Sequence, residues 1–453
     1  MKEVAGNLPE SCVVKIWQDC LAGRTDLVTE EDGPIEVVYP GRPNDDRGAD
    51  LCDAIIATGH GLRRGDVEIH VRSSSWWGHG HHRDPLYNRV ILHVVFQRDT
   101  EAAATLQNGR KVPTLALAKY ITDTAGWDAG GYPLSRHPMP CRVMIDRRGP
   151  GFLGSILDMA GDQRFQARVV EFKQQLSQAA AELVLYQGIM GALGYVKNKV
   201  PMLTLAHRVP LSRLASAIPA EIPDDECLAR YQALLLGTAG LLPSAKAGRC
   251  RESYIHQAWV DRLESAWAAL GETATMSAGD WHFFKVRPGN SPRRRLAAMS
   301  YLLGRFREEG LLPVLVREVE RAAADADYRC LKEWLLVGAN GFWAENLDFG
   351  LPCHGVAPAL LGENRAGVIV VNVLLPFAVA WGQAASRPRL AEKASEIYCS
   401  HPALAENTLE RHMRRQLGIS RVMVNSARWQ QGLIHIYKTL CSQGKCPQCP
   451  IIA

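Results

Sequence analysis

The ionisable side chains best suited to chemistry gather between Asn44 and His93. Asp66, Glu68 and His70 alternate with apolar residues in the segment DVEIHVRS, a pattern that predicts a strand. Alternate residues of a strand point to the same side, so these three groups share one face. That face is either solvated or turned inward. An inward face would need a metal ion or another partner to compensate its buried charge.

The order of the acidic residues has a catalytic counterpart. Asp50 precedes Glu68 by eighteen residues, Glu68-x-His70 lies on the next predicted strand, and Glu10 opens a predicted helix upstream. This arrangement resembles that of PD-(D/E)XK phosphodiesterases, with Ala49 at the place of the proline and His70 at the place of the lysine. The resemblance implies that Asp50 and Glu68 hold Mg²⁺, which neutralises phosphate charge and activates water. His70 would orient or deprotonate that water, and Glu10 would assist.

A histidine-rich segment, WWGHGHHRDPLYN, follows the second of these strands. His79, His81 and Asp84 lie within six residues there, and Arg72 precedes them. We predict that these residues contact phosphate or a second ion. The segment also partly resembles the H-x-H-x-D-H zinc signature of metallo-β-lactamase-type hydrolases, but Asp84 comes one position late and no histidine follows it. Zinc-dependent hydrolysis and a simple turn cap are the alternatives.

Three of the twelve cysteines crowd into the tail as Cys441-x4-Cys446-x2-Cys449. Thiolates at this spacing can wrap one ion, so we predict a structural Zn²⁺ site, with an iron–sulfur cluster or free thiols as alternatives. Some RecB-like PD-(D/E)XK nucleases hold a [4Fe–4S] cluster with three C-terminal cysteines and one N-terminal cysteine, and the tail is similar to that arrangement. A fourth ligand is expected from His435, Cys12, Cys20 or another scattered cysteine.

The overall charge of the chain is nearly balanced. Lys+Arg total 52 and Asp+Glu total 47, and the resulting net charge of +5 excludes a polybasic nucleic-acid coat but allows a local basic face. Arginines gather at 293–295 and again between Arg411 and Arg428. They form either solvated helix faces or contacts to nucleic-acid phosphates, so nucleic acid is the expected partner.

Composition and hydropathy favour a cytoplasmic protein. Hydrophobic residues make up 47% of the chain and charged residues 22%, the balance of a soluble globular protein. The N-terminal sequence has no apolar run typical of a signal peptide, and the longest apolar stretch, 366–382, is interrupted by Asn372 and Pro376. We therefore expect no membrane span, and in the reducing cytoplasm clustered cysteines favour a metal over disulfides.

The chain of 453 residues has two regions with different sequence patterns. Short β-rich segments alternate with turns in the first part, and helical periodicity dominates the rest. The stretch 137–151, rich in Pro, Gly and Arg, joins them. We predict an α+β protein with a restriction-endonuclease-like α/β domain over 1–135. A mainly helical domain over 152–453 would follow and would carry the cysteine site.

Longer strings identify a family. GDVEIHVRSSSWWGHGHHRDPLYNRVILHVVF, PGRPNDDRGADLCDA, WHFFKVRPGNSPRRRLAAM and NSARWQQGLIHIYKTLC resemble the bacterial domain-of-unknown-function family 2851. This resemblance implies a shared fold and no particular activity. The function therefore rests on the site residues, which predict a metal-dependent nuclease. A non-catalytic nucleic-acid-binding or assembly protein with a degenerate site is one alternative, and a zinc-dependent hydrolase using the histidines is the other.

Overall fold

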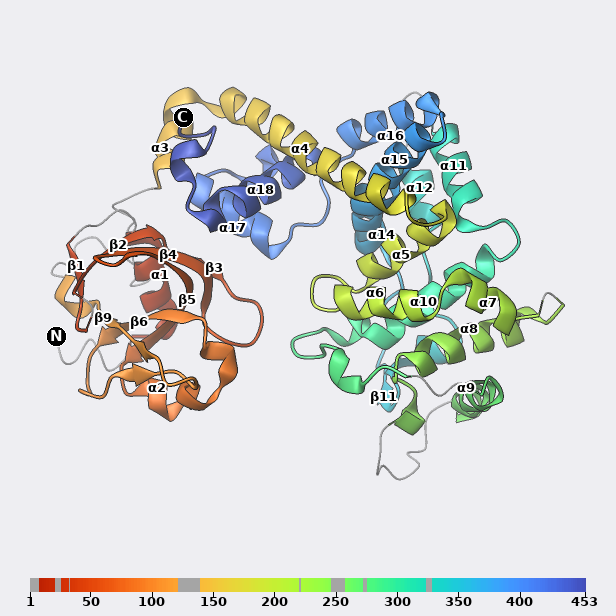
Figure 1. Ribbon diagram of the computed structural model, residues 1–453, viewed down its shortest axis with the longest axis horizontal. Helices are drawn as coiled ribbons and strands as arrows, with labels where there is room; N and C mark the ends of the chain where they lie inside the picture. Colours follow the sequence, from red (N-terminus) through yellow and green to blue (C-terminus); the bar gives the residue numbers. More distant parts are fainter. Residues whose placement is uncertain are drawn as a thin grey trace. The chain divides into compact units, whose positions relative to one another are not determined.

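The computed structural model describes residues 8–20, 26–31, 33–120, 139–219, 221–245, 257–271, 275–322 and 328–453 (Figure 1). The chain forms two compact units. The first comprises Met1–Asp162, Glu406–Asn425 and Trp429–Ala453, and the second comprises Gln163–Ala405 and Ser426–Arg428. A sheet region followed by a mostly helical region confirms the predicted α+β class.

A mixed sheet forms the centre of the first unit, with strand order β1-β2-β4-β5-β6-β9 and with β3 paired to β4. Its strands are β1 (Leu27–Thr29), β2 (Gly33–Tyr39), β3 (Arg42–Pro43), β4 (Leu51–Thr58), β5 (Gly61–Arg72), β6 (Val90–Gln97) and β9 (Thr114–Ala116). The pairs β5–β6 and β6–β9 are parallel, and the other pairs are antiparallel. A separate hairpin joins β7 (Ala104–Thr105) to β8 (Lys111–Val112). A parallel pair needs a crossover, and the segment between β5 and β6 supplies it.

Helix α1 (Glu10–Cys20) covers one face of this sheet. Its residues Val13 and Trp17 lie in one apolar core with Val67 and Ile69 of β5. Because side chains alternate along a strand, this contact turns Asp66, Glu68 and His70 to the opposite face. All three are nonetheless buried, so β5 is covered on both sides.

The end of the chain folds back onto the sheet region. The second layer of the first unit contains α3 (Pro140–Arg148), the start of α4 (Pro150–Leu176), α17 (Thr408–Leu417), η10 (Arg421–Met423), most of α18 (Ala427–Thr439), η11 (Cys441–Gln443) and η12 (Cys446–Gln448). Tyr39 Oη lies 2.6 Å from His412 Nε2, and Tyr437 Oη donates to Asp53 Oδ2 at 3.1 Å. The compact units thus differ from the predicted domains 1–135 and 152–453, which stay a prediction about independent folding.

The second unit is built from helices around one large apolar core. They are the rest of α4, α5 (Ala181–Leu193), α6 (Lys199–Arg208), α7 (Leu211–Ala217), α8 (Asp224–Thr238), α9 (Gln257–Ala269), α10 (Pro292–Arg305), α11 (Leu311–Arg321), α12 (Arg329–Glu333), α13 (Phe342–Glu345), α14 (Glu363–Ile369), the π-helical turn η9 (Val370–Leu374), α15 (Leu375–Ala384) and α16 (Pro388–Ser400). Short β10 (Asn346–Asp348) and β11 (Leu351–Pro352) pair between α13 and α14.

One helical run among the described residues, Glu363–Ala384, is apolar and long enough to cross a membrane. However, 78% of its apolar window is buried inside the protein. Most of this run lies in the core of the second unit, and the helical run continues through Asn372 and Pro376.

The arginine run at the start of α10 is buried, which corrects the expectation of a solvated helix face there. Arg294 is fully buried and donates to the carbonyl oxygens of Trp343 at 3.1 Å and Asn346 at 2.6 Å. Arg293 forms an ion pair with Asp348 at 3.0 Å. These guanidinium groups tie α10 to the β10 segment, because each planar fork can satisfy several backbone carbonyl groups at once.

Candidate metal centre on the sheet

The polar face of β5 is covered by the segment that crosses to β6. It contains α2 (Ser75–Gly78), η2 (His81–Arg83) and η3 (Pro85–Tyr87). Beneath it, Glu68 is 5% exposed and His70 is 1% exposed. The period-two pattern of DVEIHVRS placed these side chains on one face, and the covering segment makes that face an interior.

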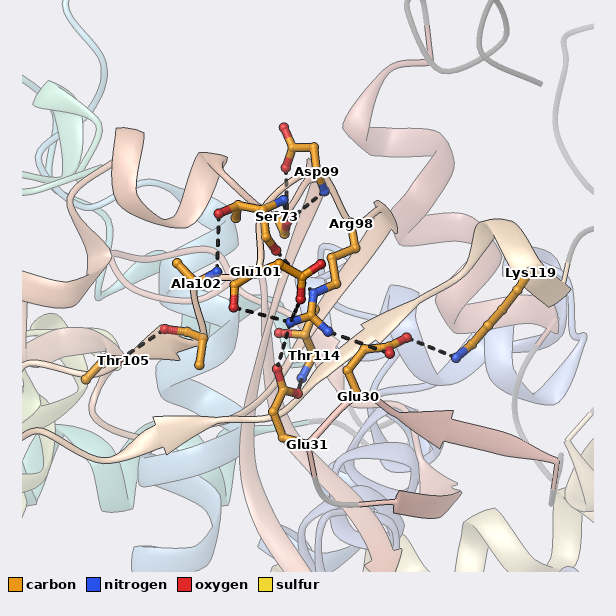
Figure 2. Close-up of polar contacts among 12 residues, drawn as sticks. Glu30, Glu31, Ser73, Arg98, Asp99, Glu101, Ala102, Thr105, Thr114 and Lys119 are labelled. Carbon is orange, nitrogen blue, oxygen red and sulfur yellow. Dashed lines mark hydrogen bonds and ion pairs between the residues drawn. The ribbon is translucent and has the colours of Figure 1, made fainter.

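Contacts to Asp99 fix the start of the covering segment (Figure 2). Ser73 Oγ donates to Asp99 Oδ1 at 3.0 Å, and the backbone N–H of Ser74 donates to the same oxygen at 2.8 Å. Trp76, fully buried, donates through its indole N–H to the carbonyl oxygen of Thr105 at 3.0 Å. These hydrogen bonds anchor the start of the segment that carries His79 and His81.

Neighbouring charges hold the ends of the surrounding strands together (Figure 2). The guanidinium of Arg98, just after β6, lies 3.6 Å from Glu30 and 3.9 Å from Glu31. Glu31 also accepts the backbone N–H of Thr114 at 2.6 Å. This cluster links the ends of β1, β6 and β9. It therefore stabilises the parallel part of the sheet.

Three imidazole rings and one carboxylate converge under the covering segment. Ligand nitrogens of His70, His79 and His81 all lie within 4.8 Å of one another. Glu68 Oε1 is 3.0 Å from His81 Nε2 and 3.5 Å from His70 Nε2. His70 Nε2 is also 3.1 Å from His79 Nδ1 and 3.3 Å from His81 Nε2. One ring nitrogen cannot satisfy all of these neighbours by hydrogen bonding, whereas a shared cation would be bound by all of them.

His93 orients the central ring. Its Nε2 lies 2.9 Å from His70 Nδ1, which leaves His70 Nε2 directed at Glu68 and the other histidines. His93 comes from β6, where the parallel register pairs it with Glu68. Tyr87 stacks on His81 with ring centroids 3.9 Å apart. In metal sites the second ring nitrogen of a ligating histidine is held by an outer partner, most often a carboxylate, a backbone carbonyl group or water, and here His93 takes that place.

Asp50 braces the carboxylate. The backbone N–H of Asp50 donates to Glu68 Oε2 at 3.0 Å, and the backbone N–H of Ile69 donates to Asp50 Oδ2 at 3.0 Å. Burial raises the pKa of Glu68 to about 9, and the charges of Asp50 and Glu10 add to that shift. Desolvation also raises the pKa of Asp50. Glu68 is buried and Asp50 is exposed, and the charge of Asp50 acts on Glu68, an arrangement that favours a proton or a cation at the buried carboxyl group.

The three buried histidines, His70, His81 and His93, are held neutral. Burial lowers the pKa of His70 to about 2 and that of His93 to about 3, and it also lowers the pKa of His81. Neutral imidazole is the form that binds metal ions, since its lone pair is free. His79 is exposed, so the cluster has one side open to solvent. Such an arrangement offers ligands inside and space for water or substrate outside.

Several predicted site residues are thus brought together: Asp50, Glu68, His70, His79 and His81. Glu10 lies in the first turn of α1, near enough for its charge to act on Asp50. Asp84 accepts the backbone N–H of Leu86 at 2.9 Å and caps η3, and Arg72 is exposed at the end of β5. Phosphate contacts by Asp84 and Arg72 stay a prediction.

Asp66 belongs to a separate ionic group. Its carboxylate accepts the backbone N–H of Asp53 at 3.3 Å and lies 3.5 Å from the Arg89 guanidinium. Asp53 has a positive φ of 63°, at the irregularity between β4 and β5, and pairs with Arg42 at 3.2 Å. Asp66 therefore shares the strand face with Glu68 but not its partners.

Sequence reasoning missed His93, Trp76 and Tyr87 as parts of the centre. His93 was visible only as a histidine flanking the cluster, and the parallel pairing of β5 with β6 brings it beside His70. The predicted tail ligands lie elsewhere in the first unit: Cys441 and Cys449 are buried and Cys446 is half-buried.

The fold and site define a mixed-sheet protein with a buried carboxylate–histidine centre. The chain belongs to the DUF2851 family, proteins of unknown function, whose family model matches residues 10–407. This confirms the predicted family. The matched range includes the whole centre and ends before α17 and the tail cysteines. Searches of curated proteins and of solved structures each return no match.

Proposed function

We propose that the protein is a metal-dependent hydrolase that cleaves phosphodiester bonds of nucleic acid. The observation that carries this proposal is the convergence of the ring nitrogens of His70, His79 and His81, with Glu68 Oε1 beside two of them, His70 and His81. The order Asp50, Glu68 and His70 on neighbouring strands supports the phosphodiesterase class, because it resembles PD-(D/E)XK enzymes in sequence arrangement.

The donor atoms favour a transition ion. Imidazole nitrogens suit Zn²⁺ and related ions, whereas Mg²⁺ prefers oxygen ligands. We therefore propose Zn²⁺ or Mn²⁺ at Glu68 and the histidines. The predicted Mg²⁺ between Asp50 and Glu68 is the competing arrangement, since each carboxylate has one oxygen outside the backbone hydrogen bonds described above.

The proposed reaction adds water across a phosphodiester. A divalent ion in the centre would lower the pKa of a water molecule and neutralise phosphate charge. Asp50, with one oxygen free of the Ile69 N–H, would accept the proton of that water, and Glu10 would assist. The water oxygen forms a bond to phosphorus, the bond to one ester oxygen breaks, and that oxygen takes up a proton. The products are a phosphomonoester and an alcohol.

Exposed arginines support a phosphate-bearing substrate. Arg72, Arg83 and Arg89 are exposed at the ends of the covering segment and within it. Guanidinium groups bind phosphate oxygens in pairs of hydrogen bonds, and such contacts supply sequence-independent affinity for nucleic acid. The cytoplasm is the compartment that we propose, because a nucleic-acid substrate and reduced cysteines are both found there.

The test compares two variants, each of which replaces an acidic residue on the polar face of β5 by the corresponding neutral amide. Protein freed of metal is reloaded with Zn²⁺, Mn²⁺ or Mg²⁺ and assayed on labelled DNA and RNA. We expect Glu68→Gln to lose metal-dependent cleavage and Asp66→Asn to retain it. Asp66 is a matched control because it is 7% exposed, close to the 5% of Glu68, and lies two residues away.

Two results would overturn the proposal. Cleavage that survives Glu68→Gln would place the activity elsewhere. Binding of nucleic acid without cleavage under any of the three metals would identify the protein as the non-catalytic binding or assembly protein that the sequence left as an alternative.

A further inference from the structure

Four cysteines from distant parts of the sequence lie in the second layer of the first unit. Cys441 begins η11, Cys446 begins η12 and Cys449 follows directly. Cys141 lies on α3, three hundred residues before Cys441. Cys141, Cys441 and Cys449 are 5%, 7% and 4% exposed and lie in one apolar core.

One amide group joins Cys141 to the tail. Gln416 Nε2 of α17 lies 3.9 Å from Cys141 Sγ and 3.7 Å from Cys441 Sγ, so both sulfurs face the same donor. Burial raises the pKa of the Cys141 thiol to about 11, and the charges of Cys449 and Cys446 raise it further. The shared Gln416 contact places Cys141 beside Cys441, and Cys446 and Cys449 follow Cys441 in the same short segment. A bound cation would remove the repulsion between such thiols when they ionise.

The loop that carries the tail thiols is tightly fitted. Gly444 has a φ of +66°, a conformation that glycine adopts at little cost, and a Cβ there would lie 2.9 Å from Ile55 Cδ1 of β4. Arg64 of β5 donates to the carbonyl oxygen of Gln443 in the same turn. The turn is thus fixed to the sheet on one side, and its first cysteine, Cys441, contacts Gln416 of α17.

We propose that Cys141, Cys441, Cys446 and Cys449 form a closed four-thiolate metal centre. Its chemistry is that of a thiophilic metal, either Zn²⁺ or an iron–sulfur cluster, since both are held by four cysteines. Cys141 is the fourth ligand in place of His435, Cys12 or Cys20. Four protein ligands leave no open position, so the centre fastens the chain end to α3 and has no part in catalysis. The proposal is independent of the hydrolase function.

The experiment measures metal in the full-length chain purified without oxygen. Zinc, iron and acid-labile sulfide are quantified in a background that carries both His79→Ala and His81→Ala, so that metal at the histidines of the sheet centre does not contribute. We expect about one zinc per chain, or iron with sulfide and absorption near ~400 nm. Either result supports the centre, and the two results distinguish the metals.

Two matched variants identify the fourth ligand. We expect Cys141→Ala to lower the metal content at least tenfold and Cys12→Ala to leave it unchanged. Cys12 is 3% exposed on α1, so both changes remove a buried thiol of the first unit. Cys446→Ala, at a half-buried position, guards against a folding defect and should also lose metal. Metal retained at the parental level in Cys141→Ala, or a parent without zinc and iron, would overturn the proposal.

Discussion

The first unit contains two candidate metal centres of opposite design. The sheet centre uses a carboxylate and imidazoles, and one of its ligands, His79, is exposed. The tail centre uses thiols, three of which are almost fully buried. An ion with an accessible side can bind water and substrate, whereas an ion enclosed by four thiolates can only hold chain segments together. The difference separates a site for chemistry from a site for stability.

The two centres also differ in how their ligands are oriented. In the sheet centre, hydrogen bonds from backbone N–H groups hold Asp50 and Glu68, and His93 orients His70. In the tail centre, the side-chain amide of Gln416 contacts two of the sulfurs, and backbone N–H groups donate to Cys141 and Cys449. Thiolates bind metal strongly enough to organise their own loop, while a catalytic site needs its ligands fixed in advance.

The largest expected effect is that of Glu68→Gln, which should reduce the activity of the protein without reducing its stability. Glu68→Gln should lower phosphodiester cleavage by about 100-fold or more, because losing a metal ligand exceeds the 10- to 100-fold cost of losing an outer partner. The melting temperature of the metal-free protein should stay the same or rise, since a neutral amide replaces a buried carboxyl group. Parallel activity and melting assays check this. A lower melting temperature together with retained cleavage would contradict the division of roles.

The converse result is expected at the tail. Cys446→Ser should lower the free energy of unfolding by about 3–5 kcal/mol, as loss of a structural metal does, while cleavage by the folded protein is unchanged. Denaturant unfolding followed by fluorescence, with activity measured before denaturant is added, tests both arms. Cys52→Ser, at a half-buried position on β4, is the control and should change neither quantity.

A smaller effect, on metal affinity, is expected from replacing His93, the histidine that contacts His70. His93→Phe keeps an aromatic ring against Trp76 but removes the nitrogen that holds His70. The affinity of the sheet centre for metal should fall by about 10- to 100-fold, and the tail centre should keep its metal. Competition with a chromophoric chelator measures the first quantity, and elemental analysis measures the second. An unchanged affinity would reduce His93 to a packing role.

The smallest expected effect is a pH dependence of stability at His412, on the same helix as Gln416. Burial lowers the pKa of His412 to about 4, and the charges of Arg42 and Arg415 lower it further. The unfolded chain, with a pKa near ~6.5, therefore binds a proton more readily than the folded chain. This contribution to stability is present above about pH 6.5 and is lost as the pH falls through about 4. Between pH 7 and pH 5 the loss is roughly 2 kcal/mol. Unfolding at pH 7 and pH 5 should show a smaller difference for His412→Gln than for the parent.

Much of the sheet centre followed from short-range patterns. The alternation in DVEIHVRS placed Glu68 and His70 on one face, and the next segment carried His79 and His81. The structure brings these four together because the covering segment is short and starts directly after β5. The α+β class and the family were predicted in the same way, from periodicity and from strings of residues.

Other features depended on packing between distant segments. The sequence left open whether the Glu68 face was solvated. Helix α1 packs on the Val67 and Ile69 side, and the segment between β5 and β6 buries the opposite side, which carries Glu68. The arginines of α10 have the composition of a solvated face, yet the β10 segment supplies carbonyl groups that make their burial tolerable.

The sequence by itself determined which residues could act as ligands and which neighbours along the chain would share a face. Only the tertiary structure decided that His93 stands beside His70 and that Cys141 faces the tail. The reason is that the periodicity of side chains along a strand or a helix follows from the local backbone conformation, which neighbouring residues determine. Parallel pairing of β5 with β6, and the return of α17 to α3, arise from burial of apolar surface, which carries no record of order along the chain.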